Sequence, residues 1–179
     1  LQGGDQNKHG KSLLNDDGSD TSIMEAIRYV YSRGGVIAGT SAGMHIMSNN
    51  AFWYRNSDIA LQVNNTEFYS ISDIPTSGDL FPNIPNNNLS IPGINIMPSG
   101  VLNDTHFDAR GRLGRLIVAM RDTEKTIGIG SDEGTGMAIR ENIGTVIGVH
   151  GVFIVDGANG KYSQDGDVSI FNASDIKVH

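Results

Sequence analysis

The 179-residue sequence contains no cysteine, which excludes disulfide bonds, thiolate metal sites and a cysteine nucleophile. It also lacks any apolar run approaching the roughly 20 residues that a membrane-spanning helix needs. Basic residues are outnumbered by acidic ones, and the formal net charge is −7. This charge argues against nucleic acid or an anionic membrane surface as the main partner.

Proline is scarce and glycine abundant. The chain has five prolines and 23 glycines, close to twice the average glycine share of about 7 %, and no low-complexity run. This composition is typical of many tight turns between short elements. The length is sufficient for one core, so residues 1–179 are expected to form a single domain.

Residues 34–43 contain the most informative pattern in the chain. An apolar, β-prone run leads into Gly-Thr-Ser-Ala-Gly, and a helix-compatible segment follows directly. This order of strand, sharp turn and helix predicts a nucleophile elbow with Ser41 at the bend. The strained backbone of such a turn requires small residues two positions away, and Gly39 and Gly43 meet that requirement. The Ala42 N–H would lie at a helix N-terminus, where it can stabilise an oxyanion. The alternative is an ordinary glycine-rich turn with a surface serine.

The remaining pattern alternates helix and strand first and becomes strand-rich later. It predicts a mixed α/β sheet with a parallel centre and an antiparallel edge. The elements expected are a strand end at 1–6, a polar loop at 7–20, a helix from 21 or 22 to 33, a strand at 36–38, a helix at 113–121, a strand at 126–130, a hairpin of 145–149 with 152–156, and a last strand near 168–171.

Residues 49–98 break this pattern and contain all five prolines. We expect a long, irregular insertion there. Connections of this length are often lids or binding loops, but a surface insertion without function fits equally well.

A serine nucleophile needs a base, and the base needs an orienting group. His106 is the strongest of the five histidines because it lies at a loop-to-helix junction beside several arginines. Glu133 and Asp132 are both candidates for the acid, since they follow a strand and functional groups gather at strand ends. The remaining histidines are expected to be solvent-exposed or packing residues: His9, His45, His150 and His179.

Three arginines, at positions 110, 112 and 115, crowd the first turns of the helix expected at 113–121. Exposed cations near a helix N-terminus oppose its dipole by roughly 0.3–1 kcal/mol each. A site that binds carboxylates would account for this unfavourable placement. The alternative is that these are surface arginines paired with Asp104 or Asp108.

Four motifs in this order resemble the cyanophycinase branch of the S51 serine peptidases, a family that also contains the α-aspartyl dipeptidases. They are Gly3-Gly4-Asp5-Gln6, Gly39-Thr40-Ser41-Ala42-Gly43, Asp104-Thr105-His106-Phe107 with the three arginines, and Gly128-Ile129-Gly130-Ser131-Asp132-Glu133. The resemblance implies a flavodoxin-like three-layer α/β/α sandwich, similar to class I glutamine amidotransferases. It also implies that the first part of that fold precedes Leu1, either as missing residues or as an N-terminal fragment of the same precursor.

The resemblance also assigns roles. Ser41 would be the nucleophile, His106 the general base and then acid, and Glu133 the orienting carboxylate. Backbone amides at Gly4 and Ala42 would form the oxyanion hole. The positions that match the family's substrate site are Gln6, Asp104, Thr105, Arg110, Arg112 and Arg115.

The implied activity is hydrolysis of aspartyl peptide or isopeptide bonds, without a metal or cofactor. Cyanophycin has a polyaspartate backbone with arginine on each β-carboxyl group, so arginines would bind its carboxylates and Asp104 its guanidinium groups. Thr105 stands where glutamine is expected, which leaves the exact polymer specificity open. The alternatives are an α-aspartyl dipeptidase and a catalytically silent binding or structural relative. A homodimer is the expected assembly.

Overall fold

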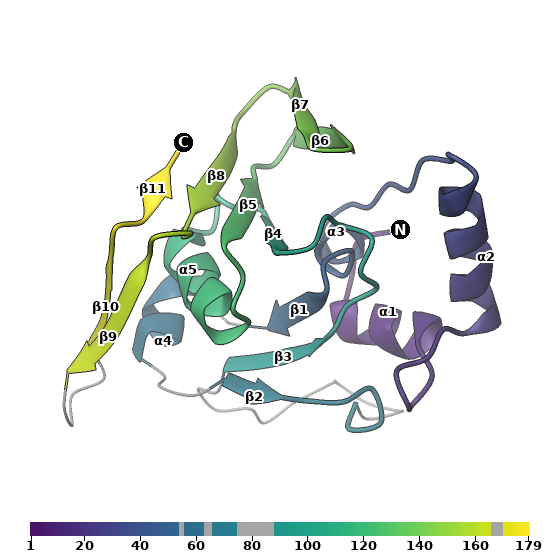
Figure 1. Cartoon of the computed structure of the whole chain (residues 1–179), viewed down its shortest axis with the longest axis horizontal. Helices are drawn as coiled ribbons and strands as arrows, with labels where there is room; N and C mark the ends of the chain where they lie inside the picture. The colour runs from purple at the N-terminus through teal and green to yellow at the C-terminus, as the bar shows by residue number, and fades with distance from the viewer. Residues whose placement is uncertain (54–55, 63–65, 75–87, 166–169) are drawn as a thin grey trace.

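The computed structural model describes residues 1–53, 56–62, 66–74, 88–165 and 170–179 of an α/β chain (Figure 1). The helices in this part of the chain are α1 (Gln6–Leu13), α2 (Ser22–Ser32), α3 (Ala42–His45), α4 (Ser57–Gln62) and α5 (Leu113–Asp122). The strands are β1 (Asn50–Trp53), β2 (Thr66–Phe68), β3 (Asn88–Pro92), β4 (Val101–Thr105), β5 (Ile127–Ser131), β6 (Thr135–Arg140), β7 (Ile143–Gly148), β8 (Val152–Asp156), β9 (Lys161–Asp165), β10 (Ile170–Ser174) and β11 (Lys177–Val178). The α/β class is as predicted, and the three-layer sandwich stays a prediction.

A four-stranded sheet of order β11-β8-β5-β4 positions the site. β4 and β5 are parallel, while β8 and β11 add antiparallel strands, so the expected mixture of pairings is confirmed. Because Thr105 pairs with Ser131 at the ends of β4 and β5, the residues that follow both strands emerge at one edge. Helix α5 connects these strands and packs closely on β5: a Cβ added to Gly128 would lie 2.6 Å from the Met120 sulfur.

The prediction of a loop at 7–20 is wrong for its first half, because residues 6–13 form helix α1. The Asp5 side chain accepts a hydrogen bond from the Asn7 N–H at 2.9 Å, which caps the helix. Gly10 faces the core, and a Cβ there would lie 3.3 Å from Ile71. The polar composition of this segment concealed its short buried face. By contrast, α2 and α5 lie where the apolar spacing predicted them.

The strand expected at 36–38 is also wrong, because residues 35–40 have no regular structure. A strand needs a neighbour along its length, and among the described residues this segment has backbone hydrogen bonds only to Val30 at its start and to Leu1 and Gly43 near its end. The Leu1 ammonium donates to the Ala38 carbonyl, and the Thr40 N–H donates to the Leu1 carbonyl at 3.0 Å. Val36 is accordingly 88 % exposed.

The hairpin expected from 145–149 and 152–156 pairs differently. β7 pairs with β6, whereas β8 pairs with β5. The tight turn between β6 and β7 contains Glu141 in the left-handed region at φ 56°. Gly148 then adopts φ 146°, where the chain leaves the ribbon before reaching β8. In Figure 1 the β6–β7 ribbon extends away from the four-stranded sheet.

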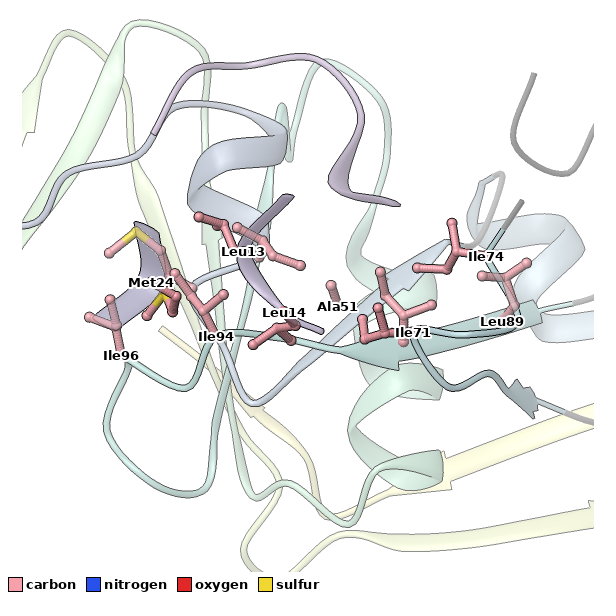
Figure 2. Close-up of a cluster of buried hydrophobic side chains, with 12 residues drawn as sticks. Leu13, Leu14, Met24, Ala51, Ile71, Ile74, Leu89, Ile94 and Ile96 are labelled. Carbon is pink, nitrogen blue, oxygen red and sulfur yellow. The ribbon is translucent and has the colours of Figure 1, made fainter. Parts of the chain in front are cut away.

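The stretch at 49–98 contains regular structure that we did not expect. β1, β3 and β2 form a three-stranded sheet, antiparallel between β1 and β3 and parallel between β3 and β2. This sheet shares a hydrophobic core with α1 and α2, drawn in Figure 2, whose members include Leu13, Met24, Ala51, Ile71 and Leu89. Residues 75–87, with three of the five prolines, lie outside the described residues.

A second core joins α4, α5 and the four-stranded sheet, with Phe52 of β1 among its members. Strand β1 therefore contributes to both cores, since Ala51 belongs to the first. Within the described residues, no helix is long and apolar enough to cross a membrane. The homodimer and the N-terminal fragment of the same precursor, both expected from the sequence, stay predictions.

Candidate active site

Ser41 lies at a strained turn directly before helix α3. Its backbone has φ 51° and ψ −122°, and the helix begins at Ala42. A Cβ added to Gly39 would lie 2.3 Å from the Gly43 carbonyl oxygen. One added to Gly43 would lie 2.5 Å from the Gln2 carbonyl oxygen. No side chain fits at either glycine, which agrees with the steric requirement argued from the sequence.

A continuous chain of hydrogen bonds runs from this serine to a carboxylate. Ser41 Oγ lies 2.9 Å from His106 Nε2, and His106 Nδ1 lies 2.7 Å from Glu133 Oε1. His106 follows β4 directly, and Glu133 is two residues past the end of β5. The parallel register of the two strands brings these side chains together. The His106 side chain is 24 % exposed and that of Glu133 is 57 % exposed, so water reaches the pair.

The structure separates the two acids that the sequence left open. Asp132 accepts hydrogen bonds from the Asp108 N–H at 2.8 Å and from the Gly151 N–H at 3.4 Å. It therefore braces the loops around the site, and Glu133 is the acid that contacts His106.

A pocket of about 260 Å³ opens beside Ser41 and His106. Its lining brings together nearly all the predicted site residues, together with two that were not predicted: Gly4, Gln6, Ser41, Ala42, His45, Trp53, Thr105, His106, Arg110, Arg112 and Arg115. Gly4 has φ 139°, a conformation that favours glycine. Among the described residues, the backbone N–H groups of Gly4 and Ala42 donate no hydrogen bond.

Two of the predicted site residues do not line the pocket: Glu133, which lies behind His106, and Asp104, which is fully buried. Asp104 is surrounded by hydrogen-bond donors. Its carboxylate accepts from Arg115 Nε at 2.6 Å, from Arg115 Nη2, and from Arg112 Nη1 at 3.3 Å. The Thr105 N–H also donates to it, at 2.8 Å. The expectation that Asp104 binds a substrate guanidinium is therefore wrong. Its acceptor oxygens are already occupied by the protein's own arginines, which it holds at the base of the pocket.

The charges in this cluster shift the pKa values of its members. Burial alone would raise the pKa of Asp104, but the charge and hydrogen bonds of Arg115 outweigh it and leave the pKa lowered. Burial, followed by the charge of Arg115, lowers the pKa of Arg112 to about 10. Arg112 and Asp104 are thus both ionised near neutral pH. Two arginines, Arg112 and Arg115, share the single carboxylate of Asp104, so the cluster has an excess of positive charge.

Sequence reasoning missed His45 and Trp53 as pocket residues. His45 was expected to be either a packing or a surface residue; it is 3 % exposed, which makes it a packing residue, but it also lines the pocket. Trp53 comes from β1, inside the stretch expected to be irregular, and no local signal marked it. In the described part of the chain, no group of three His, Asp or Glu side chains could hold a metal ion.

Comparison with known proteins gives one consistent result. The chain is 35 % identical over 160 residues to proteins named cyanophycinase from Trichormus variabilis and from a Nostoc species, an alignment that covers 87 % of this chain and 44 % of each relative. A cyanophycinase from Geminocystis herdmanii is 30 % identical over 155 residues, covering 84 % of this chain and 48 % of the relative. The chain is similar to cyanophycinases.

The chain spans a little under half the length of these curated relatives. No family model matches it. The similarity to cyanophycinases therefore rests on the alignments, which cover most of this chain.

Proposed function

We propose that this chain carries the active site of a serine peptidase of the cyanophycinase type, which cleaves aspartyl peptide or isopeptide bonds through an acyl-enzyme. The observation that carries the proposal is the unbroken contact from Ser41 through His106 to Glu133, beside a pocket lined by three arginines. Similarity to cyanophycinases supports the peptidase class.

In the first half of the proposed reaction, Ser41 Oγ attacks the carbonyl carbon while His106 Nε2 takes its proton. Glu133 accepts the Nδ1–H of His106 and stabilises the imidazolium that forms. The developing oxyanion would accept hydrogen bonds from the N–H groups of Gly4 and Ala42. The C–N bond then breaks, the leaving amine takes the proton from His106, and Ser41 is left as an ester.

In the second half, a water molecule attacks the ester carbonyl while His106 takes a proton from that water. The bond between the acyl group and Ser41 Oγ breaks, and His106 returns its proton to Oγ. The carboxylic acid product leaves and the free enzyme is restored. His106 thus acts as base and then as acid in each half, which fits a side chain that is partly exposed to water.

The arginines define the substrate chemistry. Arg110, Arg112 and Arg115 line the pocket, and Arg112 and Arg115 share the buried carboxylate of Asp104, whereas Arg110 forms no ion pair within the described residues. The resulting excess of positive charge favours a ligand with carboxylates, such as an aspartyl main chain. Gln6 and Thr105 would add neutral hydrogen-bonding groups at the wall.

The test is hydrolysis of cyanophycin and of short α-aspartyl peptides by the wild type and by Ser41→Ala, together with labelling by a fluorophosphonate. We expect labelling at Ser41 and a loss of turnover of many orders of magnitude in the variant. Faster turnover of short α-aspartyl peptides than of the polymer would instead identify an aspartyl dipeptidase. Absence of both labelling and turnover would identify a catalytically silent relative and refute the proposal.

A further inference from the structure

His45 lines the pocket, yet it belongs neither to the proposed triad nor to the arginine cluster, so its role is not yet accounted for. It lies one helical turn after Ser41, at the end of α3, and its side chain is 4 % exposed. Its ring nitrogens face two different parts of the site. Nε2 meets the backbone of Phe52, and Nδ1 lies 3.7 Å from Asp104 Oδ1.

The contact with Phe52 fixes strand β1 to the helix that carries the serine. His45 Nε2 lies 3.1 Å from the Phe52 backbone nitrogen and 3.0 Å from its carbonyl oxygen. The same carbonyl accepts a hydrogen bond from Gln6 Nε2 at 3.2 Å. The Phe52 carbonyl already has a donor in Gln6, so His45 Nε2 need not donate to it. A neutral His45 ring can therefore accept the Phe52 N–H at Nε2 and carry its own proton on Nδ1, facing the Asp104 carboxylate.

The Phe52 ring contacts both His45 and Arg115, so the position of His45 affects that of Arg115. It contacts the His45 ring edge-on, with centroids 4.4 Å apart and an interplanar angle of 70°. On the Phe52 ring lies the Arg115 guanidinium, 5.4 Å from the ring centroid, in a cation–π contact. Asp104 holds the same guanidinium through Nε and Nη2. His45 therefore contacts two groups that orient Arg115, the Phe52 ring and the Asp104 carboxylate.

The next residue along β1 links this contact to a further residue of the pocket lining. Trp53 follows Phe52 directly and lines the pocket together with Arg110 and Arg112. Since β1 is joined to α3 through Phe52, the position of Trp53 depends on the same His45 contact. An aromatic face at this point suits the apolar stem or the guanidinium of a substrate side chain.

We propose that His45 is a positioning residue for substrate recognition, which holds Phe52, Trp53 and the Asp104–Arg115 pair in the arrangement that binds an acidic chain. The inference rests on the proposed function for the identity of the substrate, but not for the geometry. His45 does not touch the reacting atoms. Its removal should weaken substrate binding while leaving the serine and its base in place.

The test compares His45→Leu with His45→Gln. Leucine removes both polar contacts, whereas a glutamine amide can meet the Phe52 backbone at the position of Nε2. We expect His45→Leu to raise KM for an acidic aspartyl substrate by about tenfold or more, with kcat within about threefold of wild type. His45→Gln should restore most of the affinity. Exposed His150, replaced in His150→Leu, is the matched control and should change neither value.

Two further measurements keep the inference separate from the proposed function. The rate of Ser41 labelling by a small neutral fluorophosphonate should be the same in wild type and His45→Leu. In a Ser41→Ala background, calorimetry with a short polyaspartate should show the same loss of affinity on adding His45→Leu, whether or not the wild type hydrolyses anything. The role of His45 would be overturned if Ser41→Ala bound polyaspartate with the same affinity whether or not it also carried His45→Leu. It would also be overturned if a folded His45→Leu protein lost labelling to the same extent as it lost turnover. A His45→Gln protein that folds but binds as weakly as His45→Leu would overturn it as well.

Discussion

Two histidine–carboxylate pairs lie at the same pocket and differ in nearly every physical respect. His106 and Glu133 are in close contact at 2.7 Å, and more than half of the Glu133 side chain is exposed. His45 and Asp104 are 3.7 Å apart, and both are buried. The first pair has water and a hydroxyl group within reach, so it can pass protons. The second is surrounded by fixed charges and can only hold its neighbours in place.

Burial explains the difference. A buried carboxylate is costly unless cations and hydrogen bonds compensate it, and Asp104 receives that compensation from Arg115 and Arg112. Once compensated by these groups inside the protein, it is not exposed to a ligand in the pocket. Glu133 needs no such compensation because water solvates it, so it remains available to His106. The same two residue types thus serve proton transfer at the surface and positioning in the interior.

The largest expected effect comes from breaking the exposed pair at His106. In His106→Asn, we expect kcat/KM to fall by about 10⁴-fold or more, because no base remains to take the serine proton. Asparagine tolerates the left-handed conformation that His106 adopts at φ 50°, so the fold should be kept. Steady-state kinetics and circular dichroism check both points. A folded variant within tenfold of wild type would rule out His106 as the base.

The next effect tests which acid serves that base. Glu133→Gln should lower kcat by roughly 10²- to 10⁴-fold, since an amide cannot stabilise the imidazolium. Its free energy of unfolding should change by less than about 0.5 kcal/mol, as for other exposed positions. Asp132→Asn is the matched control, because its acceptor oxygens hold backbone N–H groups instead. If Asp132→Asn lost more activity than Glu133→Gln, the assignment of the acid would be reversed.

The exposed pair was accessible from the sequence, and the buried pair was not. Ser41 directly precedes helix α3 in a glycine-rich pattern with a strong local signal, while His106 and Glu133 follow β4 and β5, whose parallel register brings these two side chains together. The role of Asp104 was misjudged because its burial depends on tertiary contacts, among them those with Arg112 and Arg115, that spacing in the sequence does not reveal. The part played by His45 depends on Phe52, which lies in a stretch where proline and asparagine hid the short strands. Long-range packing of that kind leaves no periodic trace.

Elements at the edges of the molecule were missed for a related reason. Helix α1 is polar on most of its surface, and its start depends on a cap at Asp5 more than on apolar spacing. The pairing of β7 with β6, and not with β8, depends on the conformation of Glu141 and Gly148. Local spacing predicts that a strand exists but does not fix its partner.

The buried pair should dominate stability, in contrast to the exposed one. Asp104→Asn leaves two guanidinium groups at the base of the pocket without their carboxylate, and we expect a loss of about 3–5 kcal/mol in the free energy of unfolding. Urea denaturation followed by tryptophan fluorescence measures it, since Trp53 is the single tryptophan. A loss no larger than that of Glu133→Gln would contradict the comparison drawn between the pairs.

The smallest expected effect is a pH dependence of stability that belongs to His45 alone. Burial, opposed by the charge of Asp104 and reinforced by Arg115 and Arg112, lowers the pKa of His45 from 6.5 to about 4. Below pH 6.5 the unfolded chain therefore binds a proton at this residue that the folded chain does not bind. Stability is then fully present above pH 6.5 and is lost as pH falls toward 4.

Between pH 7 and pH 5 this difference should cost the wild type about 2 kcal/mol that His45→Gln does not lose, because glutamine does not titrate. Urea unfolding of both proteins at pH 8, 7, 6 and 5 separates this contribution from the acid sensitivity that they share. The two curves should run parallel between pH 8 and pH 7 and diverge below. Curves that stay parallel down to pH 5 would mean that His45 takes up a proton in the folded state, beside Asp104, and that the buried pair is ionised like the exposed one during turnover.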